Sequence, residues 1–477
     1  MLTLLFLPIS IGIANLANLL DLPAAVKALM LALMLGPLSL DFLLSKRMES
    51  DKRPIRAKLL LFLGLFQAII TWQIVSPLLT DNDVFEFSFT AMTLQGFVPF
   101  CLLFLHDRKP IFHTISATDS LLTGVCISAV AAVALSFSPL GPLYTSFKYA
   151  TDSPVIGDTL IRVCLPLFPG TVPGGIYCGL TLTLGLTILL FRLHQGSRLI
   201  TYVAVLSIVG GLAGLLQTGT RNGVVAVVLV TLLLFLTERL SRRFRTTTLA
   251  AALVLVSACL PFAYQPLQPI IADRALGPFL EFITRGENER EAFTLAGRSL
   301  IWSEFGSGMD SPSQWVFGNG PSGELALGLN REFNYAVHGF DSDNTYLSHF
   351  HNLSLNMIYS AGALGLLVFW VTWLLAWTYS GTLLPYSRTR LTTRALLLFF
   401  PVSGATDSLL SVSYEYFGVL FILTCVAQIV DRQSFPADCT PARPETLTRT
   451  TQLRQLAEQQ HRLATFPTQH AFTKHPL

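Results

Sequence analysis

The chain has 477 residues, of which 52% are hydrophobic and only 13% are charged, with a formal net charge of +3. A soluble domain usually has about 25% charged residues, so this composition excludes a cytosolic enzyme, a secreted disulfide scaffold and a disordered chain. It predicts a polytopic membrane protein, and the small net charge argues against nucleic-acid binding. The seven cysteines form no Cys-x-x-Cys pair, so we expect neither a disulfide framework nor a zinc site.

Apolar runs recur along most of the chain. A membrane-spanning helix needs about 20 mostly apolar residues, and this criterion predicts twelve spans. Their approximate limits are residues 3–20, 26–44, 59–77, 87–105, 118–137, 174–191, 199–217, 223–237, 247–265, 353–378, 395–411 and 413–430. The first run has no basic segment before it and another apolar run follows at once, so we interpret it as an uncleaved span. We therefore expect an all-α polytopic membrane protein with about 12 transmembrane helices over residues 1–430.

Basic residues gather in alternate loops between these spans. They are Lys46, Arg47, Lys52, Arg53, Arg56, Lys58, Arg108, Lys109, Arg192, Arg198, Arg239, Arg242, Arg243, Arg245, Arg388, Arg390 and Arg394. Cytoplasmic loops are enriched in Lys and Arg, so we expect this side and both termini to be cytoplasmic. The polar, proline-containing residues 431–477 then form a cytoplasmic tail that is largely disordered.

One large hydrophilic segment, residues 266–352, falls on the opposite side. We expect a loop that contains short helices and is a part of the transmembrane unit. It has eleven acidic residues and five arginines. An anion site in this loop must therefore use individually placed arginines and not a general basic surface.

The first candidate site residue is Arg221, in the turn QTGTRNG at residues 217–223. The turn precedes a predicted helix, whose first N–H groups favour anions, and a guanidinium matches the geometry of phosphate oxygens. The alternative is an interfacial arginine that reaches toward lipid headgroups, which is the commoner use of such a residue.

The second candidate is Arg298, in the segment GRSLIWSEF at residues 297–305. If this segment is helical, Arg298, Trp302 and Phe305 share one face, with Trp302 supporting the arginine. The alternative is a surface helix in which Trp302 and Phe305 form a small core.

Two glycine-containing segments receive structural interpretations. Residues 318–321 (GNGP) predict a tight turn, and we favour a plain turn over the alternative of direct contact with a ligand. The small residues of 360–365 (SAGALG), in the tenth predicted span, are expected to allow close helix packing.

The third candidate is His351, where the large loop meets the tenth span. A neutral imidazole is the usual general base near neutral pH, and Asn352 is placed either to cap the helix or to hold the imidazole. A structural role stays open. His349 also invites a metal interpretation, which His338, Asp341 and Asp343 only keep open.

Two ionisable residues lie at membrane depth: Asp407 in the eleventh span and Glu415 at the start of the twelfth. Such groups have either a function or a structural partner. We favour a structural ion pair or a hydrogen bond to backbone.

The order of these motifs carries more information than any one of them. The turn TGTRNG, then GRSLIW, then GNG, then HNLSLNMIYSAGALGLL resembles the O-antigen ligase and polymerase family. The resemblance covers about residues 200–378, and the twelve-span layout extends it over most of the chain.

The resemblance implies a membrane-embedded, inverting glycosyltransferase that needs no metal and no cofactor. Its donor would be a glycan on undecaprenyl diphosphate, and its acceptor either lipid A–core or another lipid-linked glycan. It implies that Arg221 and Arg298 bind the diphosphate and that His351 is the base. It also implies the bacterial inner membrane, with the site on the periplasmic side. No Walker or Rossmann motif for a nucleotide is present in the sequence.

We expect an O-antigen ligase, with a polysaccharide polymerase of the same family as the alternative. A transporter or lipid-linked oligosaccharide flippase is the rival from another class, because twelve spans are common there too. That class favours ionisable groups at mid-membrane, whereas the candidate residues here cluster near one surface. A non-catalytic assembly partner is a third alternative, which would leave the arginines and the histidine unexplained.

Overall fold

The computed structural model of the chain describes a large part of the compact unit Met1–Ser434. The described residues are 2–19, 36–47, 53–79, 103, 105, 108–110, 116–137, 149–152, 159–168, 171–194, 197–239, 243–272, 298–320, 323–329, 331–333, 349–383, 387–407, 409 and 415–434. All statements about the structure concern these residues.

Ten of the twelve predicted spans overlap with described helices. These are α1 (Leu2–Leu19), α3 (Pro54–Leu79), α6 (Ala117–Ser136), α7 (Thr171–Leu190), α8 (Arg198–Thr218), α9 (Arg221–Arg239), α10 (Arg243–Ala272), α17 (Leu353–Ser380), α18 (Arg388–Gly404) and α19 (Glu415–Ser434). Among the described residues, seven helices are long and apolar enough to cross a membrane. A helical, multi-pass architecture is thereby confirmed. Residues 26–35 of the second predicted span and residues 87–102 of the fourth lie outside the described residues, so the total of twelve stays a prediction.

Four short strands accompany the helices. β1 (Ser45–Arg47) pairs antiparallel with β2 (Arg108–Pro110), and β3 (Tyr149–Asp152) pairs antiparallel with β4 (Thr159–Arg162). Each strand has three or four residues, so the two ribbons are small additions to a predominantly helical fold.

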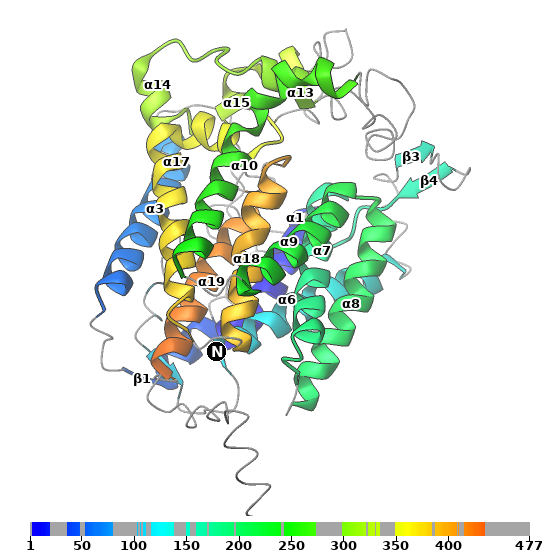
Figure 1. Cartoon of the computed structure of the whole chain (residues 1–477), viewed down its shortest axis with the longest axis vertical. Coiled ribbons are helices and arrows are strands. Elements are labelled where there is room, and N and C mark those ends of the chain that lie inside the picture. The colour runs from blue at the N-terminus through cyan, green and yellow to red at the C-terminus, as the bar shows by residue number, and fades with distance from the viewer. Residues whose placement is uncertain are drawn as a thin grey trace, which may run out of the picture. The chain divides into compact units, whose positions relative to one another are not determined.

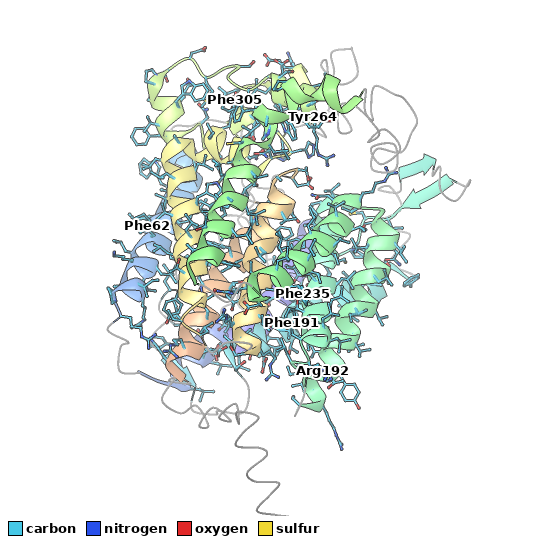
Figure 2. The ribbon with its side chains drawn as sticks, viewed as in Figure 1. Phe62, Phe191, Arg192, Phe235, Tyr264 and Phe305 are labelled. Carbon is cyan, nitrogen blue, oxygen red and sulfur yellow. The ribbon has the colours of Figure 1, made fainter. Side chains whose placement is uncertain are left out.

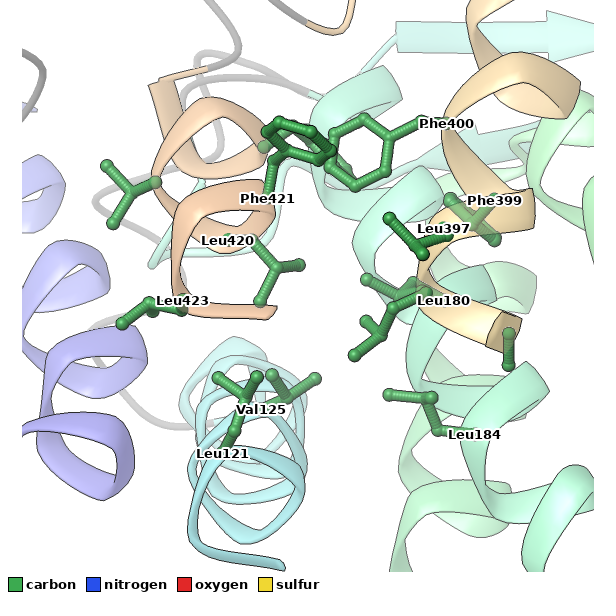
Figure 3. Packing of buried hydrophobic residues seen from close by; sticks show 14 of the residues in the cluster. Leu121, Val125, Leu180, Leu184, Leu397, Phe399, Phe400, Leu420, Phe421 and Leu423 are labelled. Atoms are coloured by element: carbon green, nitrogen blue, oxygen red, sulfur yellow. The ribbon is translucent and has the colours of Figure 1, made fainter. Parts of the chain in front are cut away.

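The interior of the bundle is built by α6, α7, α18 and α19. Figure 3 shows Leu121 of α6, Leu180 of α7, Leu397 of α18 and Leu420 of α19 around this interior, and all four are buried. Outward-facing apolar side chains lie instead on α3, α8, α9 and α10. They include Trp72, Tyr202, Leu216, Val228 and Leu255, each more than 60% exposed. Large exposed apolar surfaces are rare in soluble proteins and suit contact with lipid.

A second hydrophobic cluster lies beyond one end of the bundle. Three short helices contribute to this region: α13 (Arg298–Ser303), α14 (Pro312–Phe317) and α15 (Gly323–Ala326). We call the described residues 298–333 the cap. Figure 1 shows the cap helices together beside the ends of α10 and α17. The cluster joins Trp302 and Phe333 of the cap to Tyr264 of α10 and to Phe350; Figure 2 labels Tyr264 and Phe305 at this end.

Candidate active site

The candidate site is built around the end of α18. We call residues 403–407 the α18 terminus. Carbonyls at the end of a helix commonly need partners from outside the helix, and three carbonyls of the α18 terminus accept hydrogen bonds from other elements. The Asn222 amide donates to the Ser403 carbonyl (3.3 Å), the Asn352 amide to Ala405 (2.8 Å) and the Arg298 Nε to Thr406 (2.9 Å). These three hydrogen bonds bring the starts of α9, α17 and α13 together at the α18 terminus.

Asp407 is at the centre of this arrangement. Its Oδ2 accepts a hydrogen bond from the Asn222 amide. Its Oδ1 lies 3.7 Å from a terminal guanidinium nitrogen of Arg298 and 3.6 Å from Nδ1 of His351. The Asp407 side chain is 0% exposed, whereas the Arg298 and His351 side chains are 23% and 21% exposed. A buried carboxylate is stable only when it is paired, and its partners here keep part of their surface accessible.

His351 has a backbone conformation that few residues adopt. Its φ is +49°, in the left-handed region where histidine is enriched over most non-glycine residues. The next residue, Asn352, is the N-cap of α17 and accepts from the N–H groups of Ser354 (2.9 Å) and Leu355 (3.1 Å). The tight turn therefore lets Asn352 begin the helix while the imidazole of His351 faces Asp407.

Asn352 combines two structural tasks. Its oxygen caps α17, and its amide donates to the carbonyls of Ala405 and Ser257. It thereby ties the start of α17 to both α18 and α10. Of its two expected roles, these contacts correspond to the cap.

Trp302 links α13 to the segment that contains His351. Its indole N–H donates to the Phe350 carbonyl at 2.7 Å, and its side chain is buried in the cap cluster. The predicted three-residue face is only partly present, because α13 ends at Ser303 and Phe305 lies in the following turn. Phe305 packs edge-on against Phe350. Trp302 and Phe305 thus form a core, while Arg298 points to the α18 terminus.

His349 is buried and differs chemically from His351. Burial, and secondarily the nearby His351, lower the pKa of His349 to about 3. Its imidazole is therefore neutral at physiological pH. Within the described part of the chain, no three His, Cys, Asp or Glu side chains lie close enough to hold a metal ion. The further residues of the metal interpretation, His338, Asp341 and Asp343, lie outside the described residues.

Arg221 begins α9 directly after the short turn that ends α8. The turn contains Gly219 in a left-handed conformation, and Thr220 is buried. Arg221 is partly buried and lies one residue before Asn222, which contacts Asp407. The backbone of Arg221 is therefore adjacent to the candidate site.

Two participants were not foreseen as members of the site. Asn222 gave no signal beyond its place next to Arg221. Asp407 was noticed as a charge in an apolar run, and its structural interpretation was incomplete: it pairs with the two residues that the motifs singled out. The side chain of Glu415 lies outside the described residues, although α19 begins at this residue.

Residues 203–370 match the family model described as O-antigen ligase. This segment is similar to the O-antigen ligase family. The match covers about a third of the chain and includes Arg221, Arg298 and His351, whereas Asp407 lies beyond it. The resemblance found from the sequence motifs is confirmed by this match. No curated protein matches the chain.

Proposed function

We propose that this protein transfers a glycan from undecaprenyl diphosphate to a sugar hydroxyl on lipid A–core, as an O-antigen ligase. The reaction inverts the anomeric centre and uses no metal ion. The observation that carries the proposal is the meeting of Arg298 and His351 at the buried Asp407. Both residues lie in the segment that matches the O-antigen ligase family, and proteins of that family handle lipid-linked glycans.

The donor is activated by its leaving group. As the acceptor oxygen bonds to the anomeric carbon, the carbon–oxygen bond to the diphosphate breaks and its electron pair stays with the diphosphate. Positively charged groups that face this developing charge lower the barrier. We assign this role to Arg298 and Arg221. The partial exposure of Arg298 leaves it accessible to a ligand while Asp407 and Thr406 hold it.

His351 takes the proton of the attacking hydroxyl. Its Nδ1 faces Asp407, so Nε2 is the ring nitrogen left for the acceptor. The imidazole becomes positively charged as it accepts the proton, and the carboxylate of Asp407 stabilises that charge. This division of roles between a base and the acid behind it recurs in unrelated enzymes.

We place the site on the periplasmic face of the bacterial inner membrane, with both termini in the cytoplasm. The support is the distribution of Lys and Arg in the sequence. The ends of α18 fit this placement, because Arg388, Arg390 and Arg394 lie at the end opposite the site. A transporter is less well supported, since the described site residues gather at one end of the bundle.

The test uses the whole protein in lipid vesicles, with a lipid-linked glycan donor and a lipid A–core acceptor. His351→Ala should abolish transfer while the protein stays folded in the membrane. His194→Ala is a matched control, because His194 lies far from the candidate site, in the turn after α7. The carbonyl of its neighbour Leu193 accepts a hydrogen bond from Arg388, at the end of α18 opposite the site. Normal transfer by His351→Ala would remove the base assignment.

Two further observations from the same assay separate the alternatives. EDTA should leave the rate unchanged, and a loss restored by a divalent ion would revive the metal interpretation. In cells, deletion of a ligase leaves lipid-linked polymer without attached polymer. Deletion of a polymerase leaves single repeat units on an intact acceptor, and that result would favour the polymerase alternative.

A further inference from the structure

Helix α17 is interrupted nine residues after its start. Gly362 has φ 67° and ψ −179°, a backbone conformation that is essentially restricted to glycine. A Cβ at this position would also overlap the carbonyl of Val316. The break divides α17 into two parts, which we call the short half (353–361) and the long half (363–380).

A turn of the cap donates hydrogen bonds to two carbonyls just before the break. A helix carbonyl usually accepts from the N–H group four residues later, and for Tyr359 and Ser360 that group lies beyond Gly362. The N–H of Asn319 donates to the Tyr359 carbonyl (2.7 Å), and that of Gly320 to Ser360 (3.1 Å). The side-chain amide of Asn319 donates a second, longer hydrogen bond to the Tyr359 carbonyl (3.4 Å).

The turn 318–320 can approach α17 this closely only because its first residue, Gly318, has no side chain. Gly318 has φ 76°, and a Cβ there would overlap the backbone of Ser360. The sequence GNG at 318–320, predicted as a plain turn, therefore packs into the helix break and donates hydrogen bonds to its carbonyls. The stretch 360–365 was expected to serve packing alone, and Gly362 corrects that expectation, because it ends one helical segment and begins another.

The short half lies between the two hydrophobic clusters. Leu353, Met357 and Ala361, spaced four residues apart along one face, belong to the core of the bundle. Leu355 and Tyr359, on the other side, belong to the cap cluster. The direction of the short half therefore depends on both clusters, and His351 lies immediately before its first turn.

We propose that the turn 318–320 is a positioning element for the transfer reaction. By filling the break of α17, it fixes the direction of the short half and so places His351 against Asp407 and Arg298. Asn319 is the positioning residue of this turn. The inference rests on the proposed function in one respect, namely that His351 is the base.

The lever that connects the break to the imidazole is long. At 1.5 Å per residue, His351 is about 15 Å from Gly362. A sharp helix kink exceeds about 20°, and straightening a kink of about 20° at Gly362 would move His351 by about 5 Å. A misplacement of about 1 Å can cost about 100-fold in rate. Donor binding depends on Arg298 and Arg221, which lie outside this lever.

The experiment compares glycines that share a positive φ and differ in their surroundings. Gly362→Ala and Gly318→Ala each strain a backbone with positive φ, and each new Cβ overlaps the opposite segment, Val316 or Ser360, so each should force the turn and the break apart. Gly328→Ala is the matched control, because its φ is 75° and no heavy atom lies within 4 Å of a Cβ there. Each full-length variant is assayed in vesicles for kcat and for the KM of the lipid-linked donor.

Gly362→Ala is expected to lower kcat about 100-fold with a donor KM close to that of the native protein, and Gly328→Ala to change neither value by more than about threefold. A native kcat for Gly362→Ala, or equal losses in Gly328→Ala, would overturn the inference. If Gly362→Ala does not fold, Asn319→Asp takes its place. This variant keeps the shape of the side chain and turns a donor toward Tyr359 into an acceptor, so kcat should fall about tenfold at unchanged donor KM. A native kcat there would also overturn the inference.

His351→Ala, measured alongside, separates this inference from the proposed function. If His351→Ala is inactive and Gly362→Ala is fully active, the positioning role alone is wrong. If His351→Ala remains active, the base assignment is wrong and the positioning role falls with it.

Discussion

Asp407→Asn tests whether the buried carboxylate works through His351. The substitution keeps the size of the side chain and an oxygen that can accept from Asn222. It removes the negative charge that lies 3.6 Å from the Nδ1 of His351 and 3.7 Å from Arg298. The altered quantity is therefore the stabilisation of positive charge on the imidazole, which appears when His351 takes the proton of the acceptor.

The size of the effect follows from Coulomb's law. Two unit charges about 3.6 Å apart attract by about 4.6 kcal/mol at an effective dielectric constant of about 20. His351 is about one-fifth exposed, so solvent screening lowers this value, and we take about 2 to 4 kcal/mol as the range. Since about 1.4 kcal/mol corresponds to a factor of ten in rate, kcat should fall by about 30-fold to 1,000-fold.

The assay measures kcat in vesicles for Asp407→Asn, and over long incubations it measures the residual transfer of His351→Ala and of the double variant. If Asp407 acts through His351, the double variant should be no slower than His351→Ala alone. Asp431→Asn is the control for loss of a buried carboxylate elsewhere, because Asp431 caps α6 through the N–H groups of Ala117 and Thr118. It should lower stability and leave kcat unchanged. Multiplicative losses in the double variant would refute the coupling.

Two further predictions concern the stability of the cap. Trp302→Phe removes the donor to the buried Phe350 carbonyl, which should lower the free energy of unfolding by about 1–3 kcal/mol and reduce kcat. An unchanged melting temperature would contradict the structural role of the indole. Glu324 is wholly buried, and burial raises its pKa to about 8 from about 4.5. The folded protein therefore holds a proton that the unfolded chain has lost, so the free energy of unfolding should fall as pH rises from about 4.5 to 8. Glu324→Gln should lack this slope in unfolding measurements at pH 5.5 and 8.5, and an equal slope would assign it to other groups.

The sequence predicts those parts of the fold that depend on local hydrophobicity. The tenth predicted span begins at residue 353, as α17 does, because the apolar run and the capping Asn352 coincide. The eleventh span was predicted over 395–411, whereas α18 is Arg388–Gly404. The displacement has a physical reason. Arg388 and Arg394 read as loop residues by hydropathy, but Asp119 and Glu238 pair with them inside the protein.

The sequence motifs identify individual site residues, but they do not show which residues meet in the folded protein. Arg298 and His351 stand in recognisable segments, so each could be named from the sequence. Their common partner Asp407 is 109 residues beyond Arg298 and 185 beyond Asn222, and a single sequence holds no signal for contacts at that separation. The break at Gly362 was missed for the same reason. A glycine in an apolar helix can allow close packing, mark a break or have no structural role. Only the contact with the turn 318–320, which is distant in sequence, shows that Gly362 marks a break.

The packing of α9 against α18 explains why Asp407 is held at a fixed position. At the end of α18 remote from the site, Arg394 and Arg390 both pair with Glu238 of α9, and Arg394 and Glu238 are buried. At the other end, Asn222 of α9 contacts Asp407. Removing one partner of a buried ion pair is strongly destabilising, so sliding of α18 along α9 would break the contacts at both ends together. The ion pairs far from the candidate site therefore hold its central carboxylate at a fixed depth in the bundle.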